Sequence, residues 1–312
     1  MKKVLITYYV HPVLKGGLID LGFKVVEKPE ITYAQLIDDV ANYEGIIVHT
    51  KIPIDETIID AGKSLKFIGR VGSGMEHINV AYAIQKNIAC LSSPEGNKNA
   101  VAEHALGLLL ALLNNINVAA QQVKKGSWLR EENRGVELEG KTIGIIGFGN
   151  TGTSFAQKLA GFDVKVLAYD KYSTIKEEGK VNSSTLENIF KEADIISLHI
   201  PNSNENYHFA DSHFFNSFKK PIVFINCSRG KNVNTLDLLQ ALKAEKVIAA
   251  GLDVLENEKL STYSKEEHQL LNELTQLPNV IITPHVAGWS AESKFKLANV
   301  LLNKIKEHYQ PS

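Results

Sequence analysis

The chain has 312 residues, of which 44% are hydrophobic and 22% are charged, and this length allows two domains with cores of their own. Its 34 basic and 35 acidic side chains give a formal net charge of -1 without a long run of either sign, which argues against nucleic acids and anionic membranes as partners. The two cysteines form no metal-type spacing and no disulfide framework, as is typical of a reducing cytosol.

The first third of the chain predicts alternating strands and helices. Its start is basic, but the apolar run there is too short for a signal peptide and no small-residue cleavage site follows, so we expect a buried strand and a cytoplasmic protein. Apolar, β-branched runs bounded by turn residues predict further short strands. The strands expected in this part are residues 4–6, 45–48, 67–68 and 88–91.

A turn-rich segment at residues 93–97 marks the expected domain boundary, and an uninterrupted helical pattern follows over residues 100–125. Strand patterns then recur between helical stretches, and an amphipathic helix is expected over residues 291–308. The strands expected in this second part are residues 142–146, 165–169, 195–198, 222–225, 249–252 and 280–283.

These elements predict an α/β fold with two doubly wound parallel sheets, because nearly continuous apolar strands alternate with helices that can cover both faces. The chain after residue 284 is too short to be a domain, so we expect its helix to return to the first one. The expected domains are residues 1–97 with 284–312, and residues 98–283.

Gly147, Gly149 and Gly152 form a glycine-rich turn between an expected strand and an expected helix. Such glycines also occur in tight turns without a ligand, but here they would let the backbone approach a pyrophosphate at a helix N-terminus. Asp170 ends the next strand, where a carboxylate can bind the ribose hydroxyls and repel the 2'-phosphate of NADP. NAD is therefore the expected cofactor, although Lys171 could offset part of the repulsion.

Arg229, Glu258 and His285 follow the glycine-rich turn in an order that suits one chemistry. A guanidinium placed after a strand can hold a substrate carboxylate, and an imidazole suits the proton exchanged with the substrate oxygen. Either side chain could instead be structural, and Glu258 lies in a charged segment typical of a solvated loop. Together they favour hydride transfer on a small 2-hydroxy or 2-oxo acid.

Seven motifs stand along nearly the whole chain and begin at Gly69, Asn99, Gly147, Leu198, Asn226, Leu252 and Thr283. In order and spacing they resemble those of the D-isomer-specific 2-hydroxyacid dehydrogenases. This resemblance implies a Rossmann-type NAD-binding domain inserted in a flavodoxin-like substrate domain. It also implies a small-molecule acid as substrate and a homodimer built through the cofactor domains.

By the same resemblance Arg229 would bind the substrate, His285 would be the general acid or base, and Glu258 would raise the pKa of the imidazole. Asn150 and Thr151 would meet the pyrophosphate. The nicotinamide end would be lined by His199, Pro201, Cys227, Ser228, Arg229, Asp253, His285 and Gly288. The substrate carboxylate would also meet the backbone of Val71, Gly72, Ser73 and Gly74.

Several residues depart from the family pattern or carry no motif. Lys259 replaces a proline that commonly follows the glutamate, and Glu76 with His77 stands in the glycine-rich substrate loop. Other histidines, among them His104 and His208, form no zinc spacing, so we expect no metal and assign them to packing or to the solvated surface.

Arg70 and Arg130 fall where phosphoglycerate dehydrogenases of the family tend to carry phosphate-binding arginines. The resemblance thus implies oxidation of 3-phospho-D-glycerate to 3-phosphohydroxypyruvate, the entry step of serine biosynthesis. A further arginine of that site falls near His49 or Lys51 here, so glyoxylate, hydroxypyruvate and lactate-type substrates stay open. A non-catalytic NAD(H)-responsive binding protein is another alternative, against which the retained catalytic trio argues.

Overall fold

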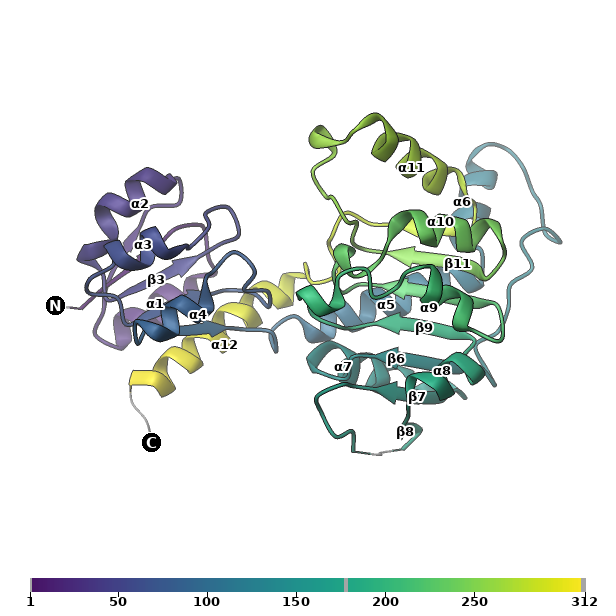
Figure 1. Ribbon diagram of the computed structural model, residues 1–312, viewed down its shortest axis with the longest axis horizontal. Helices are drawn as coiled ribbons and strands as arrows, with labels where there is room; N and C mark the ends of the chain where they lie inside the picture. Colours follow the sequence, from purple (N-terminus) through teal and green to yellow (C-terminus); the bar gives the residue numbers. More distant parts are fainter. Residues whose placement is uncertain (1, 177–178, 310–312) are drawn as a thin grey trace. The chain divides into compact units, whose positions relative to one another are not determined.

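The computed structural model describes residues 2–176 and 179–309, and the chain divides into two compact units (Figure 1). The first unit comprises Met1–Lys98 with Trp289–Ser312, and the second comprises Asn99–Gly288. The first boundary lies one residue from the predicted one. The second lies five residues later, so that His285 belongs to the second unit, because the loop before Gly288 is bonded to the sheet of that unit. Residues 310–312 of the predicted range lie outside the described part.

The first unit contains a five-stranded parallel sheet with the strand order β2-β1-β3-β4-β5. The chain leaves β1 toward β2 on one side and continues from β3 on the other, so the sheet is doubly wound. The elements are β1 (Lys3–Ile6), α1 (Pro12–Asp20), β2 (Lys24–Glu27), α2 (Tyr33–Asp39), β3 (Gly45–Val48), α3 (Glu56–Ala61), β4 (Phe67–Arg70), α4 (Val80–Gln85), β5 (Ala89–Ser92) and α12 (Ala291–Tyr309).

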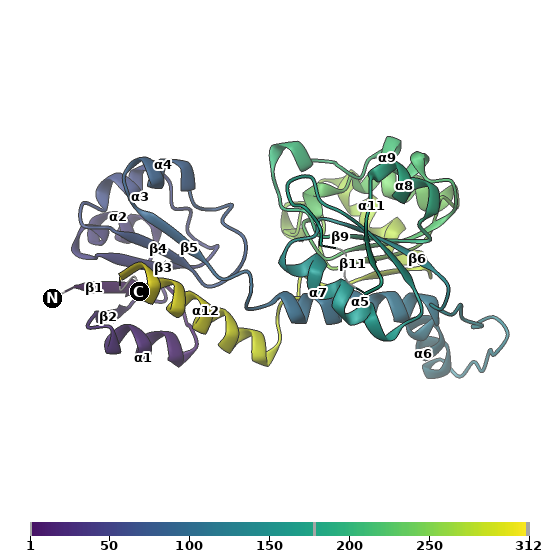
Figure 2. The same ribbon diagram turned by 90° about the horizontal axis from the view of Figure 1, so that it is seen from below.

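Helix α12 returns from the end of the chain to the first unit and lies beside α1, as Figure 2 shows. A Cβ atom on Gly17 of α1 would lie only 2.1 Å from a methyl carbon of Leu302, so glycine allows the two helices to approach closely. At the far end Tyr309 packs edge-on against Phe23 and Phe67, with ring centroids 5.1 and 5.7 Å apart. The terminal helix is thus part of this unit's core.

The second unit contains a seven-stranded parallel sheet with the order β12-β11-β10-β9-β6-β7-β8. Its winding direction reverses between β6 and β9. The elements are α5 (Lys98–Leu113), α6 (Ile116–Lys124), β6 (Thr142–Ile146), α7 (Asn150–Lys158), β7 (Lys165–Tyr169), β8 (Val181–Ser183), α8 (Leu186–Glu192), β9 (Ile195–Leu198), α9 (Ser212–Ser217), β10 (Ile222–Asn226), α10 (Thr235–Lys243), β11 (Val247–Leu252), α11 (Lys265–Gln276) and β12 (Val280–Ile282). Short 3-10 turns in the two units span Val40–Asn42, Leu159–Gly161, Asn204–Asn206, Gly230–Asn232 and Leu260–Thr262.

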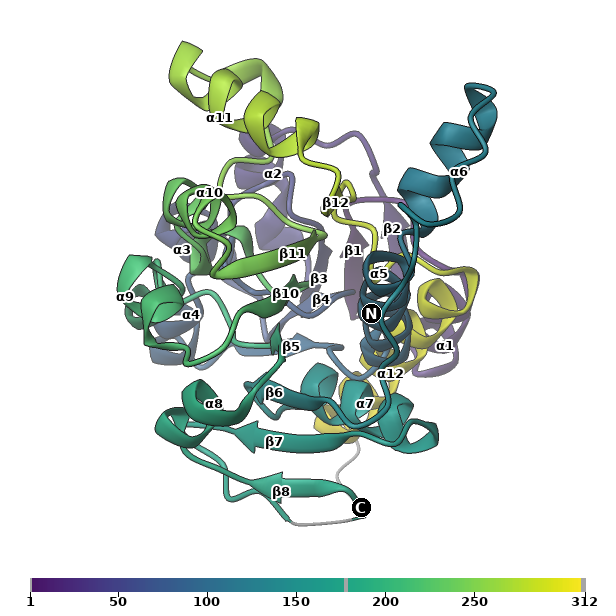
Figure 3. The same cartoon turned by 90° about the vertical axis from the view of Figure 1, so that its right-hand side faces the viewer.

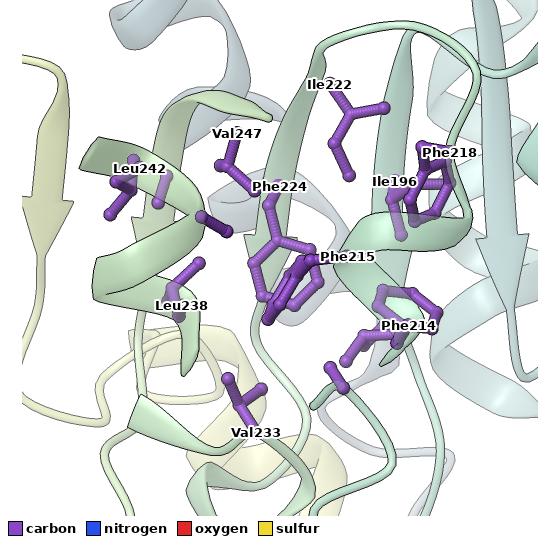
Figure 4. Packing of buried hydrophobic residues seen from close by; sticks show 14 of the residues in the cluster. Ile196, Phe214, Phe215, Phe218, Ile222, Phe224, Val233, Leu238, Leu242 and Val247 are labelled. Atoms are coloured by element: carbon purple, nitrogen blue, oxygen red, sulfur yellow. The ribbon is translucent and has the colours of Figure 1, made fainter. Parts of the chain in front are cut away.

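Each face of the larger sheet has a separate hydrophobic cluster. Helices α8, α9 and α10 cover one face and α5 and α7 cover the other, as Figure 3 shows. On the first face the phenylalanines of α9 pack against Phe224 of β10 (Figure 4). The apolar strands expected from the sequence are therefore buried on both sides, which explains why their side chains do not alternate between apolar and polar.

The helix predicted over residues 100–125 is interrupted, and the prediction of a continuous helix is wrong. Asn115 separates α5 from α6 with a φ of 51°, and the two helices meet at a bend of 63°. Asparagine adopts the left-handed conformation more readily than most residues, so the Asn114-Asn115 pair provides the break. Over the described residues, no single helix is long and apolar enough to cross a membrane. Helices α5 and α6 reach the required length and apolar composition only when the two are counted together.

Two strands, β2 and β8, were not expected from the sequence. Both lie at edges of their sheets, and β2 is partly exposed while β8 exposes two of its three residues. A short edge strand needs no continuous apolar run, because one side of it faces no neighbouring strand. The local pattern was therefore too weak to identify them.

Helix α10 offers a matched test of the core, because Leu238 is 1% exposed and Leu236 is 53% exposed. Leu238→Ala removes a buried side chain and should lower the free energy of unfolding by about 2–5 kcal/mol, whereas Leu236→Ala should change it by less than about 0.5 kcal/mol. Urea unfolding monitored by circular dichroism measures both. Equal losses for the two variants would contradict the described burial.

Candidate active site at the carboxyl edge of the larger sheet

The predicted cofactor and catalytic residues of the second unit all follow strands of one parallel sheet. Because carboxyl ends of parallel strands meet at one edge, this edge is where open α/β sheets bind ligands. The glycine-rich turn follows β6, Asp170 follows β7, His199 follows β9, Arg229 follows β10, Asp253 and Glu258 follow β11, and His285 follows β12. The turn and His199 thus flank the point where the winding direction reverses.

The glycine-rich turn has the shape that a pyrophosphate requires. Gly147 has a φ of 91°, and a Cβ on Gly152 would lie 2.1 Å from the carbonyl oxygen of Gly147, so neither position accepts a larger residue without rearrangement. A Cβ on Gly149 would meet no atom within 4 Å, so the chain is open there toward solvent. Helix α7 starts at Asn150, directly after this opening. The turn therefore fits a dinucleotide phosphate at the N-terminus of the helix.

Asp170 is bonded to the same turn through its carboxylate. Its Oδ2 accepts the N–H of Phe148 at 2.8 Å, and its Oδ1 accepts the N–H groups of Tyr172 and Ser173 at 2.9 Å. Burial acts to raise its pKa, but these hydrogen bonds outweigh burial and hold the pKa of Asp170 below its ordinary value. The carboxylate therefore stays charged at neutral pH, at the end of β7 beside the glycine-rich turn.

His199 and Thr151 brace the turn from inside the domain. The ring of His199 lies 2.9 Å from Ser197 Oγ through Nε2 and 3.2 Å from Thr151 Oγ1 through Nδ1. Burial lowers the pKa of His199 to about 3, so the ring is neutral. Both ring nitrogens thus have partners inside the protein, and the structure places this imidazole under the turn. Its neighbour in the motif, Pro201, accepts a hydrogen bond from the side chain of Asn206 at 3.0 Å.

The loop that carries Arg229 is fixed by its own hydrogen bonds. The side-chain oxygen of Asn226 accepts from the N–H and the hydroxyl of Ser228 at 3.0 and 2.8 Å, while its amide donates to the carbonyl of Arg229 at 3.1 Å. One nitrogen of the guanidinium donates to the carbonyl of Ser228 at 2.9 Å. Cys227 in the same loop is buried, and burial raises the pKa of its thiol, which disfavours the thiolate form.

Asp253 holds the loop that presents His285. Its carboxylate is 1% exposed and accepts from Thr283 Oγ1 at 2.6 Å and from the N–H groups of Val286 and Ala287 at 2.9 and 2.8 Å. The N–H of His285 also donates to the carbonyl of Asp253 at 2.8 Å. His104 meets this cluster through polar contacts, with Nε2 2.9 Å from Thr283 Oγ1 and 3.5 Å from the Asp253 carboxylate. Asp253 is thus bonded within the protein on both of its oxygens.

His285 and Glu258 form the central pair of the site. Nδ1 of the imidazole lies 2.8 Å from Oε2 of the carboxylate, and the two side chains are 47% and 43% exposed. The hydrogen bond to Glu258 raises the pKa of His285 above its ordinary value, against burial and the nearby charge of Arg229, which both act to lower it. With Nδ1 bonded to the carboxylate, Nε2 is the nitrogen that can exchange a proton with a substrate.

Glu258 is carried by a loop that sequence reasoning expected to be solvated, yet the residues before it are firmly held. Oε1 of Glu256 accepts from His208 at 2.6 Å, and its Oε2 accepts the N–H of Thr235, the first residue of α10, at 2.7 Å. A Cβ on Gly230 would lie 1.9 Å from the carbonyl oxygen of Leu255, so this loop lies directly against the one that carries Arg229. His208 is therefore an anchor and not a solvated residue.

Asn257 completes the fixation on the other side of the loop. Its backbone carbonyl accepts the hydroxyl of Tyr263 at 2.5 Å, its side-chain oxygen accepts the N–H of Lys259 at 3.0 Å, and its amide donates to Thr262 at 3.1 Å. These bonds order the segment in which Lys259 stands instead of proline. In the sequence, the hydrogen-bond acceptors Glu256 and Asn257 next to Glu258 are the signal that could have pointed to this anchoring. The partners of Glu256, His208 and Thr235, are distant in the sequence, so the signal does not identify them.

The predicted substrate loop belongs to the first unit. Gly72 has a φ of 155° and a Cβ there would lie 2.5 Å from the Arg70 guanidinium, which folds back over the loop. The N–H of Gly72 donates to Ser93 Oγ at 3.0 Å, and Ser73 Oγ donates to Asn97 at 3.0 Å. Arg130 is exposed and belongs to the second unit, whereas Arg70 belongs to the first. That the two arginines bind one substrate phosphate therefore stays a prediction.

Glu258→Gln removes the charge that favours the imidazolium, so the pKa of His285 should fall. Because that pKa is raised above 6.5 in the folded protein, the pair stabilises the fold fully below about pH 6.5, and this contribution is lost as the pH rises through the raised pKa. The contribution should be only about 0.2–1 kcal/mol, since both side chains are nearly half exposed.

NMR titration of the His285 ring signals measures the shift directly. Glu139→Gln, a substitution of the same type at an exposed position, is the control and should leave the titration of His285 unchanged. An identical His285 titration in wild type and Glu258→Gln would show that the carboxylate does not set the charge of the imidazole.

Comparison with known proteins places this chain in a family. Residues 106–287 match the sequence profile described as "D-isomer specific 2-hydroxyacid dehydrogenase, NAD binding domain". The chain is 34% identical over 286 residues to a D-3-phosphoglycerate dehydrogenase of Archaeoglobus fulgidus, which covers 91% of this chain and 53% of that protein. It is also 34% identical over 284 residues to a hydroxypyruvate reductase of Thermotoga maritima, covering 89% and 90%.

Solved structures agree over nearly the full length. A D-2-hydroxyisocaproate dehydrogenase superposes with a TM-score of 0.85 at 26% identity, covering 99% of this chain and 97% of the other. D-lactate dehydrogenase from Aquifex aeolicus, complexed with NAD and lactic acid, gives a TM-score of 0.83 at 26% identity, covering 99% and 96%. This chain spans about half the length of several phosphoglycerate dehydrogenases that it matches. The chain belongs to the D-isomer-specific 2-hydroxyacid dehydrogenase family and carries that family's NAD-binding domain in its second unit.

Proposed function

We propose that this protein transfers a hydride between NAD and carbon 2 of a small D-2-hydroxy acid, most specifically in the oxidation of 3-phospho-D-glycerate to 3-phosphohydroxypyruvate. The observation that carries the proposal is the His285–Glu258 pair, 2.8 Å apart and close enough to Arg229 for its charge to act on the imidazole, at the carboxyl edge of an NAD-binding domain. A general acid or base and a cation for the substrate are thus present together.

The roles of these side chains follow from their chemistry. Bound NAD supplies the hydride acceptor in the oxidation and, as NADH, the donor in the reverse direction. His285 Nε2 takes the proton of the substrate hydroxyl as the C2–H bond breaks, and it returns that proton to the oxygen in the reduction. Arg229 holds the substrate carboxylate by paired hydrogen bonds. Glu258 keeps the imidazole protonated to higher pH, which favours the reduction.

The assignment of substrate rests on two lines of support. Several relatives at 30–34% identity carry the name D-3-phosphoglycerate dehydrogenase, and Arg70 provides a cation at the end of β4. Because a relative of matching length is named hydroxypyruvate reductase, an unphosphorylated 2-oxo acid is the alternative. Three further properties remain predictions: the homodimer, the cytoplasmic location and the place in serine biosynthesis.

NADH absorbance measures the proposed reaction. With NAD and 3-phospho-D-glycerate, or with NADH and phosphohydroxypyruvate, wild-type protein should turn over, and His285→Ala should lower kcat by about 100-fold or more because the proton-transfer group is lost. His213→Ala, at an exposed histidine of α9, is the control and should retain activity.

Parallel assays with hydroxypyruvate, glyoxylate, pyruvate and 2-oxoglutarate separate the alternatives. Activity only on an unphosphorylated acid would retain the mechanism and exclude phosphoglycerate. No turnover of any acid, together with tight NADH binding, would favour the alternative of a non-catalytic NAD(H)-responsive binding protein.

The cofactor preference depends on the charge of Asp170. Asp170→Asn keeps the shape of the side chain and one acceptor oxygen but removes the negative charge, so kcat/KM for NADP relative to NAD should rise by about 10-fold. The ratio is measured with either cofactor at saturating acid. Asp38→Asn, at an exposed residue of α2, is the control, and an unchanged ratio in Asp170→Asn would exclude the proposed discrimination.

A further inference from the structure

Three loops that follow neighbouring strands of the larger sheet meet at His208. This residue lies in the loop after β9, and β9, β10 and β11 are adjacent in the sheet. The loop after β10 carries Arg229, and the loop after β11 carries Glu258. A residue that is bonded to both loops therefore connects the cation proposed for the substrate with the carboxylate that bonds the catalytic imidazole.

The backbone of His208 is bonded to the loop after β10. Its N–H donates to the carbonyl of Lys231 at 2.9 Å. Two residues later the N–H of Ala210 donates to the carbonyl of Asn232 at 2.9 Å, and the carbonyl of Ala210 accepts the N–H of Asn234 at 3.0 Å. His208 has a φ of 52°, a left-handed conformation that histidine and asparagine adopt more readily than most residues. The backbone alone thus joins the first two loops.

The ring of His208 reaches the third loop. Nε2 lies 2.6 Å from Oε1 of Glu256, and the two side chains are 25% and 29% exposed. Nδ1 lies 3.4 Å from the amide nitrogen of Asn234, whose side-chain oxygen accepts the N–H of Asp237 at 3.1 Å at the start of α10. Because that oxygen is used at the helix N-terminus, the amide nitrogen faces Nδ1 and donates to it. Nδ1 is then an acceptor, and Nε2 carries the proton that is donated to the Glu256 carboxylate.

Glu256 connects this bond to the proton-transfer pair. Its other oxygen, Oε2, accepts the N–H of Thr235 at 2.7 Å, so both oxygens of the carboxylate are bonded. Glu258 follows two residues later, and its Oε2 lies 2.8 Å from Nδ1 of His285. Glu258 and His285 are both nearly half exposed, so burial alone does not fix their contact. The position of Glu258 therefore depends on how firmly its loop is held.

We propose that His208 is a positioning residue: its Nε2–H bond to Glu256 joins the loops after β9, β10 and β11 and keeps the Glu258 carboxylate against His285. The inference rests on the proposed function, since His285 is the group that exchanges the proton there. His208 acts through Glu256 and exchanges no proton with the substrate. Such a residue affects the charge of the imidazole as well as the stability of the fold, and the two effects are measured separately.

Two amide variants at position 208 provide a matched test. In His208→Gln the amide nitrogen can take the place of Nε2 and donate to Glu256, whereas the shorter side chain of His208→Asn places its amide near the position of Nδ1 and does not reach the carboxylate. Asparagine suits the left-handed backbone better than glutamine does, so a defect confined to His208→Asn does not come from the backbone. The control is His213→Asn, at an exposed position of α9.

NMR titration of the His285 ring is the first measurement. The hydrogen bond to Glu258 raises the pKa of His285, so a looser contact lowers it. Burial and Arg229 also lower this pKa and Asp253 raises it, and the variants change neither residue. We expect the pKa of His285 to fall in His208→Asn and to keep its wild-type value in His208→Gln and in the control. A lower Tm of His208→Asn without a change in this titration, or an equal fall of the pKa in both position-208 variants, would overturn the proposal.

Kinetics separates this inference from the proposed reaction. With NADH and an accepted 2-oxo acid at about pH 8, kcat should fall about 5-fold in His208→Asn and less than about twofold in His208→Gln. If no 2-oxo acid is turned over but the pKa of His285 falls in His208→Asn alone, the proposed reaction fails and the positioning role stands. If an acid is reduced and the titration of His285 is the same in all variants, the reaction stands and the positioning role fails.

Discussion

The hydrogen-bonded, buried carboxylate of Asp253 is the constraint on which the position of His285 depends. A buried charge is unfavourable unless it is hydrogen-bonded, and here Thr283, Val286 and Ala287 donate to it from the loop after β12. Because the carboxylate itself follows β11, these bonds join the ends of two neighbouring strands. His285, which has a φ of 55°, is held between them in a left-handed conformation that is uncommon for a residue other than glycine.

A second set of contacts brings the acid to the imidazole. The backbone at Gly230 and Leu255 approaches so closely that a side chain at position 230 would not fit, and Glu256 bridges from this loop to Thr235 and His208. Glu258 is thereby presented on a loop with fixed ends although its own side chain is nearly half exposed. Hydrogen bonds of this kind order the segment in which Lys259 stands.

Three histidines show how surroundings give one side chain different properties. His285 has a raised pKa because a carboxylate bonds its ring, so it can exchange protons near neutral pH. Burial lowers the pKa of His199 to about 3, and burial with Arg70 lowers that of His77 to about 4. His199 has internal partners and supports the glycine-rich turn, whereas His77 has none over the described residues. Neither burial nor the identity of a partner can be read from the residue type.

The sequence by itself determined the α/β class, most strands and the glycine-rich turn, because apolar periodicity and turn residues act locally, and from it Arg229, Glu258 and His285 are proposed as site residues. It did not identify the edge strands β2 and β8 or the break at Asn115. Only the tertiary structure decided that Asp253 is bonded to the loop of His285 and that His208 anchors Glu256. These contacts join residues from different strands, and no local pattern encodes which distant donor will meet a given carboxylate.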